Sequence, residues 1–168
     1  GSVSTTNSIV GGAAFPAIAP RSDFGCATLP DGRVYIGGGV AGGVDRAEII
    51  EIDPSTNTTR TRTATLTLAR HSLGAAAVNT SLGPRVYFIG GRVSGPSGTR
   101  NVVEEYDPAA DTIRTVAPLP HALREFGICT VPAINSNDQL DFVWVVGGVT
   151  DFTVNVTNSA YRFTPDPS

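Results

Sequence analysis

Lysine and methionine are absent from the 168-residue sequence, and cysteine (two residues) and tryptophan (one residue) are scarce. Two cysteines are too few for a disulfide framework or a cysteine-based metal motif. No apolar run approaches the roughly 18 residues that a membrane-spanning helix needs. A net charge of −3 argues against general binding to nucleic acid or to anionic membranes. The length suits a single domain, residues 1–168.

The two cysteines, Cys26 and Cys129, both lie in short apolar runs that read as strands. We expect both thiols to be free and buried, where they would behave as small hydrophobic side chains. The alternative is a disulfide bond between them.

A repeated pattern dominates the sequence. An apolar run that ends in a pair of glycines occurs three times, with the pairs at Gly38-Gly39, Gly90-Gly91 and Gly147-Gly148. The runs are rich in β-branched and aromatic residues, are separated by Gly, Pro, Asp and Asn, and show no sustained helical period. This pattern predicts an all-β protein. A period near 50 residues with several strands per unit is typical of propeller blades.

The repeats resemble those of the kelch-type β-propellers, in which the glycine pair is followed by a tyrosine and then a large apolar residue. The corresponding residues are Tyr106 and Ile113 in the second repeat, Ile52 and Thr59 in the first, and Phe163 in the third. The tryptophan that the family usually carries on its outer strand is missing. The resemblance implies four-stranded antiparallel blades, but it implies no particular function because one fold hosts many functions.

The chain ends indicate how the blades are divided. Residues 7–16 align without a gap to residues 111–120, which we expect to contain the outermost strand of the second repeat. We therefore divide the chain into an outer strand that closes the last blade of its own or a partner chain (1–20), repeat 1 (21–69), repeat 2 (70–123) and repeat 3 without its outer strand (124–168).

Three blades cannot close a ring, because propellers have four to eight, and an open arc would expose apolar faces. A two-fold homodimer would supply six blades and remove the open strand edges. The predicted fold is therefore a β-propeller of three four-stranded antiparallel kelch-like blades, completed to six by homodimerisation. The alternative is a structural or engineered half of a longer propeller that has no ligand.

An arginine precedes each repeated run, at Arg21, Arg70 and Arg124, spaced 49 and 54 positions apart. Near the channel mouth these residues would form a cationic rim for a carboxylate, a phosphate or an acidic peptide. The alternative is structural, with each arginine bonding carbonyls or a carboxylate of the neighbouring blade. Asp23 and Glu125 are candidate ion-pair partners.

The loops after the glycine pairs differ between repeats, which makes them better candidates for a specific site. Their basic residues are Arg46, Arg92 and Arg100, and Phe152 would be an exposed aromatic anchor. The alternatives are ordinary solvated loops and a Phe152 side chain that packs under its own loop.

The remaining motifs are few. The two histidines, His71 and His121, take part in no metal-ligand spacing, and we expect neither a metal nor a cofactor. Glycosylation sequons occur at Asn57, Asn79 and Asn155, all in expected turns or loops, which hints at a secreted origin. The location of the protein is otherwise open.

The favoured function is a non-catalytic interaction module. Its expected partners are a second copy of itself and a protein or a small polar or acidic ligand at the loop face around the channel. The alternative is a kelch-type enzyme that acts on a sugar or another small polar substrate at the channel mouth, with Glu125 or Asp23 beside an arginine. We expect no nucleic-acid or membrane partner.

Overall fold

The fold is built from strands alone in the part of the chain that can be described. The computed structural model describes residues 18–95, 98–132, 141–150 and 155–165. These residues form thirteen strands and no helix, which confirms the predicted all-β class. Accordingly, none of their segments is a helix long and apolar enough to cross a membrane. Residues 7–16, for which we predict an outer strand, lie outside the described residues.

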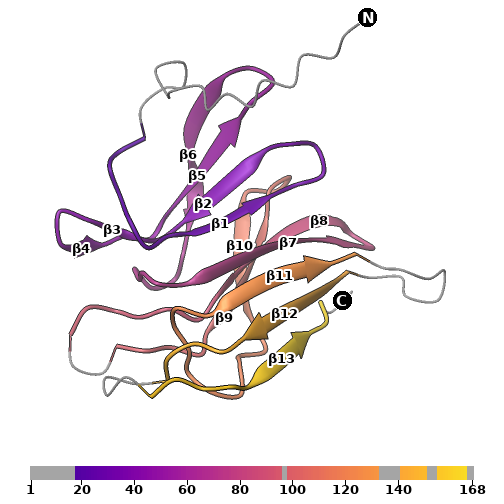
Figure 1. The fold of residues 1–168 in the computed structure, drawn as a ribbon. Helices are drawn as coiled ribbons and strands as arrows, with labels where there is room; N and C mark the ends of the chain where they lie inside the picture. The colour runs from indigo at the N-terminus through magenta and orange to yellow at the C-terminus, as the bar shows by residue number, and fades with distance from the viewer. Residues whose placement is uncertain (1–17, 96–97, 133–140, 151–154, 166–168) are drawn as a thin grey trace, which may run out of the picture.

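Three antiparallel sheets follow one another along the chain (Figure 1). The first contains, in spatial order, β1 (Gly25–Thr28), β2 (Val34–Gly37), β5 (Glu48–Asp53) and β6 (Thr58–Thr65). The second contains β7 (Gly74–Thr80), β8 (Gly83–Ile89), β9 (Val103–Asp107) and β10 (Thr112–Val116). The third contains β11 (Gly127–Val131), β12 (Phe142–Val146) and β13 (Ala160–Phe163). A fourth, two-stranded sheet, β3 (Val40–Ala41) with β4 (Val44–Asp45), occupies a segment that we predicted to be a loop.

The three larger sheets pack face against face, with their first strands β1, β7 and β11 next to one another (Figure 1). One buried core lies between the first and second sheets and includes Tyr35, Phe88 and Tyr106. A second core lies between the second and third sheets and includes Tyr87 and Val143. None of the described sheets closes on itself, so their arrangement as blades of a ring stays a prediction.

The burial of each strand follows from its place in this stack. In β8, the residues from Val86 to Ile89 are all fully buried, because the second sheet has a neighbour on both faces. In β12, Val143 and Val145 are buried against the second sheet, whereas Trp144 and Val146 are exposed on the opposite face. Side chains alternate between the two faces of a strand, so the third sheet has one face that no described sheet covers.

The glycine pairs are strand ends, as predicted, and all six glycines have a positive φ angle. They also let consecutive sheets approach. A Cβ on Gly38 would lie 2.6 Å from the carbonyl oxygen of Arg70, and one on Gly90 would lie 2.5 Å from that of Leu123. Such distances exclude any side chain, because real Cβ atoms do not approach a carbonyl oxygen so closely. The first glycine of each of these two pairs is therefore required by packing as well as by backbone conformation.

Both cysteines are free, as expected, but the prediction that they are buried is wrong. Cys26 and Cys129 are exposed because each lies on the outward face of its strand, whereas the flanking residues Ala27 and Ile128 pack toward the second sheet. Apolar neighbours in the sequence indicate a strand, but they do not indicate which of its faces is covered.

Candidate functional site

Arg70 is a structural residue in the interior of the second sheet. Its side chain has no exposed surface. The guanidinium donates hydrogen bonds to the carbonyl oxygens of Gly90 (2.8 Å) and Phe88 (3.3 Å), and it forms an ion pair with the equally buried Glu104. Burial lowers the pKa of Arg70, and attraction to Glu104 opposes that shift. Arg70 therefore has no surface to offer to a ligand, and the prediction that it lies in an exposed rim is wrong.

Arg21 holds a similar place in the first sheet. Its side chain is 5% exposed and donates a hydrogen bond to the carbonyl oxygen of Gly38 (3.1 Å). Its nearest carboxylate is that of Glu48, 3.9 Å away, rather than the expected Asp23. Arg21 and Arg70 thus bond groups of their own sheet, whereas the structural alternative placed those partners on a neighbouring one.

Arg124 is not the third member of this set, although the sequence pattern predicted that it was. Gly39 donates its N–H to the carbonyl of Arg70, and Gly91 donates to that of Leu123 at the next sheet. Leu123 therefore occupies the place of Arg70. Equivalent positions are counted from the glycine that begins each first strand, which is Gly127 in the third sheet. Arg124 lies three residues before that glycine, whereas Arg21 and Arg70 lie four residues before theirs. Arg124 pairs instead with its neighbour Glu125, as expected for that carboxylate.

The true equivalents of Arg124 are Ser22 and His71, since all three form isolated bridges with the strand-like segment after a glycine pair. His71 joins two loops there. Its Nδ1 lies 2.7 Å from Asp45, and Asp45 also accepts hydrogen bonds from the N–H (2.7 Å) and hydroxyl (2.9 Å) of Ser94. Burial disfavours the charged carboxylate, but these hydrogen bonds outweigh burial and lower the pKa of Asp45.

This trio fastens the loop of the first repeat to the loop of the second. Ser94 bonds Asp45 rather than His71, so the arrangement lacks the serine–histidine hydrogen bond that activates a nucleophile. Its role is that of a scaffold: it holds together the loops that follow the glycine pairs, which form the loop face of the molecule.

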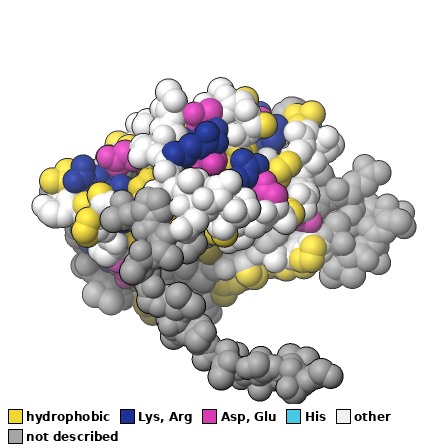
Figure 2. Space-filling model, turned by 90° about the horizontal axis from the view of Figure 1, so that it is seen from above, with side chains coloured by type: hydrophobic (Ala, Val, Ile, Leu, Met, Phe, Trp, Pro, Cys, Tyr) yellow, Lys and Arg dark blue, Asp and Glu magenta, His cyan; other side chains and the backbone are white. Residues whose placement is uncertain are grey.

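The loop arginines are partly buried and engaged with protein groups. Arg46 lies 3.8 Å from Glu48, and Arg100 donates to the carbonyl oxygen of Thr99 (3.2 Å). Arg92 pairs through its backbone with the segments on either side. On the side of the molecule seen in Figure 2, basic and acidic side chains adjoin one another instead of forming a patch of one sign. Phe152 lies outside the described residues.

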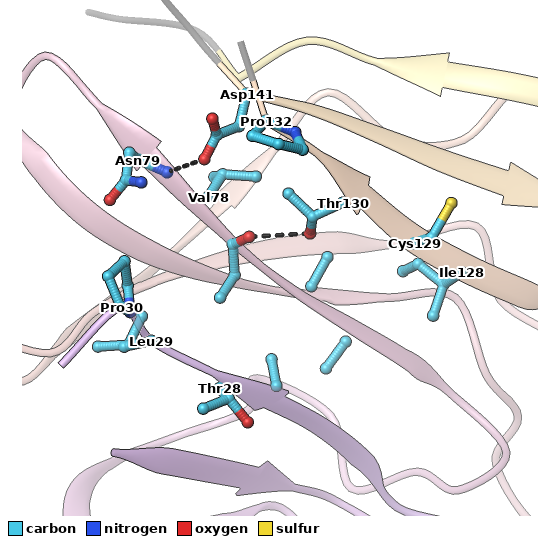
Figure 3. Close-up of a pocket in the computed structure, with 14 residues that line it drawn as sticks. Thr28, Leu29, Pro30, Val78, Asn79, Ile128, Cys129, Thr130, Pro132 and Asp141 are labelled. Atoms are coloured by element: carbon cyan, nitrogen blue, oxygen red, sulfur yellow. Dashed lines mark hydrogen bonds between the residues drawn. The ribbon is translucent and has the colours of Figure 1, made fainter. Parts of the chain in front are cut away.

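A groove of about 380 Å³ lies where the far ends of β1, β7 and β11 come together, opposite the loop face (Figure 3). Small side chains line most of it. Thr130 donates its hydroxyl to the carbonyl oxygen of Ala77 (2.9 Å), and Asn79 donates its N–H to Asp141 (2.7 Å). Among the described residues that line this groove there is no arginine and no aromatic ring, so it differs in character from the loop-face site that the sequence predicted.

Two buried polar networks were missed by the sequence analysis. Tyr35 donates its hydroxyl to Glu51 (2.6 Å), and Tyr87 donates to Glu105 (2.6 Å) at the same register in the second sheet. Burial and these carboxylates raise the pKa of both tyrosines. An arginine of the outermost strand completes each network. The recurrence of tyrosine three residues before the first glycine of a pair, at Tyr35 before Gly38 and at Tyr87 before Gly90, was the available signal.

The three sequon asparagines, Asn57, Asn79 and Asn155, are exposed. Asn79 lies within strand β7, so the prediction that all three lie in turns or loops is wrong for that residue. Asn57 has a positive φ of 55° at a tight turn, a conformation that asparagine tolerates better than most residues, so a structural reason for it exists besides glycosylation. No group of three or more His, Cys, Asp or Glu suited to a metal ion occurs among the residues that the structure describes.

No family model matches the sequence, and a search of curated proteins finds none that is significantly similar. A function therefore has to be inferred from the fold and its polar clusters.

Proposed function

We propose that the chain is a non-catalytic interaction module whose first partner is a second copy of itself. Two copies would close a kelch-like ring of six sheets around a two-fold axis and present their loops around its channel. The observation that carries this proposal is that the outer ends of the sheet stack carry the same junction groups that join the sheets within one chain.

One kind of junction bond starts at the second glycine of a pair. Gly39 donates its N–H to the carbonyl of Arg70 (2.9 Å), which joins the first sheet to the second. Gly91 donates to the carbonyl of Leu123 (2.8 Å), which joins the second to the third. The repetition of the same bond at two junctions supports a regular relation between consecutive sheets, which a propeller requires.

A second kind of junction bond runs in the opposite direction. Ser72 donates its N–H to the carbonyl of Asp23 (2.7 Å), and Glu125 donates to the carbonyl of Ser72 (3.2 Å). These three residues occupy the same place before each first strand, and each has a positive φ between 53° and 57°. A non-glycine residue seldom adopts this conformation, so its recurrence marks a backbone shape dedicated to the junction.

Backbone groups equivalent to these donors and acceptors lie at the two ends of the stack. At the third sheet they are the N–H of Gly148 and the carbonyl of Glu125; at the first sheet they are the carbonyl of Arg21 and the N–H of Asp23. None of the four has a backbone partner among the described residues. A second copy related by a two-fold axis would pair Gly148 with Arg21 and Glu125 with Asp23, twice per dimer.

The exposed face of the third sheet fits the same assembly. Trp144 and Val146 are 36% and 48% exposed, yet they occupy the register positions at which Tyr87 and Ile89 are fully buried between the second and third sheets. Packing against the first sheet of a second copy would bury them equally. Covering such an apolar face favours association, since the free energy gained scales with the apolar area removed from water.

The loop face would then be the binding surface for a further polar or acidic ligand. The junctions repeat, whereas the loops that carry Arg46, Arg92 and Arg100 differ from one another, and a specific ligand requires differences of this kind. The trio of Asp45, His71 and Ser94 supports a defined loop conformation, which lowers the entropic cost of binding.

A charge on the exposed face of the third sheet tests the assembly. Val146→Asp would bury an unpaired carboxylate in the interface, so we expect sedimentation velocity to show a monomer at micromolar concentration. Leu82→Asp is the matched control, because Leu82 is a 61% exposed apolar residue in a turn away from the sheet faces. Circular dichroism checks that both variants fold. A Val146→Asp variant that associates as strongly as the control would contradict the proposal.

A further inference from the structure

The two cysteines lie on the two outward faces of the sheet stack. Cys26 is on β1, and it points away from the second sheet because its neighbours Gly25 and Ala27 pack toward that sheet. Cys129 is on β11, and Figure 3 shows its sulfur on the opposite side of the strand from Ile128. Both thiols are free and exposed in the single chain. One cysteine therefore lies at each end of the stack, on the first strand of the first sheet and on the first strand of the third sheet.

These positions correspond to residues that meet at the internal junctions. The second and third residues of the three first strands are Cys26 and Ala27 in β1, Ala75 and Ala76 in β7, and Ile128 and Cys129 in β11. Ala27 and Ala75 share the core between the first and second sheets, and Ile128 packs against the core that contains Ala76. At each junction, the third residue of one first strand and the second residue of the next thus belong to the same core.

We infer that Cys129 of one copy faces Cys26 of the second copy across the proposed dimer interface and that the two can form an intermolecular disulfide. This inference rests on the proposed function. The packing that places Ala27 and Ala75 in one core would place the third residue of β11 and the second residue of β1 in one core as well. The two-fold axis repeats the contact, so that oxidation would close the ring with two covalent bonds.

The first strands approach closely enough for such a bond. A Cβ on Gly25 would lie 3.1 Å from the Cβ of Ala75, so the backbones of β1 and β7 are separated by small side chains only. A disulfide joins Cβ atoms about 3.5–4.5 Å apart. Gly25 lies on the same face of β1 as Ala27, two residues away, so a junction this narrow brings the side chains of facing first strands within reach of a disulfide. The larger separation of about 10 Å that is usual between packed sheets does not.

The oxidant that forms this bond is a small-molecule disulfide, and the experiment uses glutathione disulfide. The thiolate of one cysteine attacks glutathione disulfide, forms a mixed disulfide and releases one glutathione. The thiol of the facing cysteine then displaces the second glutathione as it loses its proton. Two protein thiols thereby lose two protons and two electrons, and these reduce one glutathione disulfide to two molecules of glutathione.

Exchange between two single variants tests the pairing. The unaltered chain, Cys26→Ser, Cys129→Ser and a co-refolded 1:1 mixture of the two variants are each incubated with glutathione disulfide and separated on a non-reducing denaturing gel. We expect a band at twice the chain mass for the unaltered chain and for the mixture, since the mixture contains one intact pair. Each variant alone should lose this band at least tenfold. Reduction with dithiothreitol should remove it everywhere.

Light scattering of the same samples under reducing conditions tests the dimer assembly separately from the cysteine pairing. A dimeric mass without any cross-link would overturn the cysteine pairing and leave the assembly standing. A cross-link in either variant alone, or an oxidised monomer that migrates faster than the reduced chain, would also overturn the pairing. A monomeric mass for the unaltered reduced chain would overturn the assembly and the pairing together.

Discussion

Replacing Arg70 by leucine should destabilise the protein more than any change to an exposed arginine. The guanidinium and the Glu104 carboxylate are both completely buried, and Arg70→Leu would leave that carboxylate without its counter-charge. Breaking a buried ion pair in this way costs about 3–5 kcal/mol, a large part of the 5–15 kcal/mol that holds a domain folded. For a chain of this length the loss corresponds to roughly 6–20 °C in Tm.

The third repeat shows how this loss can be repaired. Leu123 and Tyr161 occupy the places of Arg70 and Glu104 there, so the fold accepts an uncharged pair at these positions. Adding Glu104→Gln to Arg70→Leu removes the isolated charge and keeps an oxygen acceptor for the N–H of Thr67, which Glu104 accepts at 2.7 Å. The double variant should regain at least half of the lost stability.

Urea unfolding followed by circular dichroism measures both variants on one scale. The account requires a drop in the free energy of unfolding of several kcal/mol for Arg70→Leu and a smaller drop for the double variant, at equal slopes. A single variant that loses less than about 1 kcal/mol would refute the structural role of Arg70. A double variant no more stable than the single one would refute the explanation by an unpaired buried charge.

Two further predictions concern the outer turn and the loop face. Burial disfavours ionisation of Asp111, but hydrogen bonds and the guanidinium of Arg62 outweigh it and lower its pKa to about 2. The resulting stability is present above about pH 4, the pKa of an unperturbed aspartate, and is lost as pH falls toward 2. Asp111→Asn should cost about 1–2 kcal/mol at pH 6 and progressively less as pH falls through 2 in urea titrations. Asn57 already occupies the equivalent left-handed turn, so the substitution should not strain the backbone. An unchanged free energy of unfolding at pH 6 would contradict this reasoning. At the loop face, Arg92→Gln with Arg100→Gln should weaken binding of a polyglutamate peptide at least tenfold by calorimetry while circular dichroism shows that the variant still folds. Unfolding of the variant, or a lower Tm with unchanged binding, would make both residues structural.

The predictable part of the fold is the part that local chemistry dictates. The glycine pairs could be read as strand ends because the backbone there needs a positive φ, which is a local requirement. The exclusion of a Cβ at Gly38 and Gly90 comes instead from the next sheet, and the sequence did not show it. The continuous apolar run before Gly90 likewise predicted a strand, and β8 is a strand whose residues from Val86 to Ile89 are fully buried.

The rest depends on register and on which faces are covered. Arg124 was grouped with Arg70 because the pattern was counted from the arginines, whereas the junction bonds count from the start of each first strand and place Leu123 there. The pairing of Tyr35 with Glu51 requires the register of β2 against β5, which spacing along the chain does not supply. The exposure of Cys129 follows from the absence of a neighbouring described sheet, which is a property of the whole stack.

The mass of the unaltered chain in solution decides whether two copies assemble. Light scattering after size exclusion, across a range of micromolar concentrations and under reducing conditions, compares the particle with the 17.4 kDa chain. The account predicts twice the chain mass, because only two copies bring the junction groups of Gly148 and Arg21 together. A mass equal to a single chain throughout that range would contradict it.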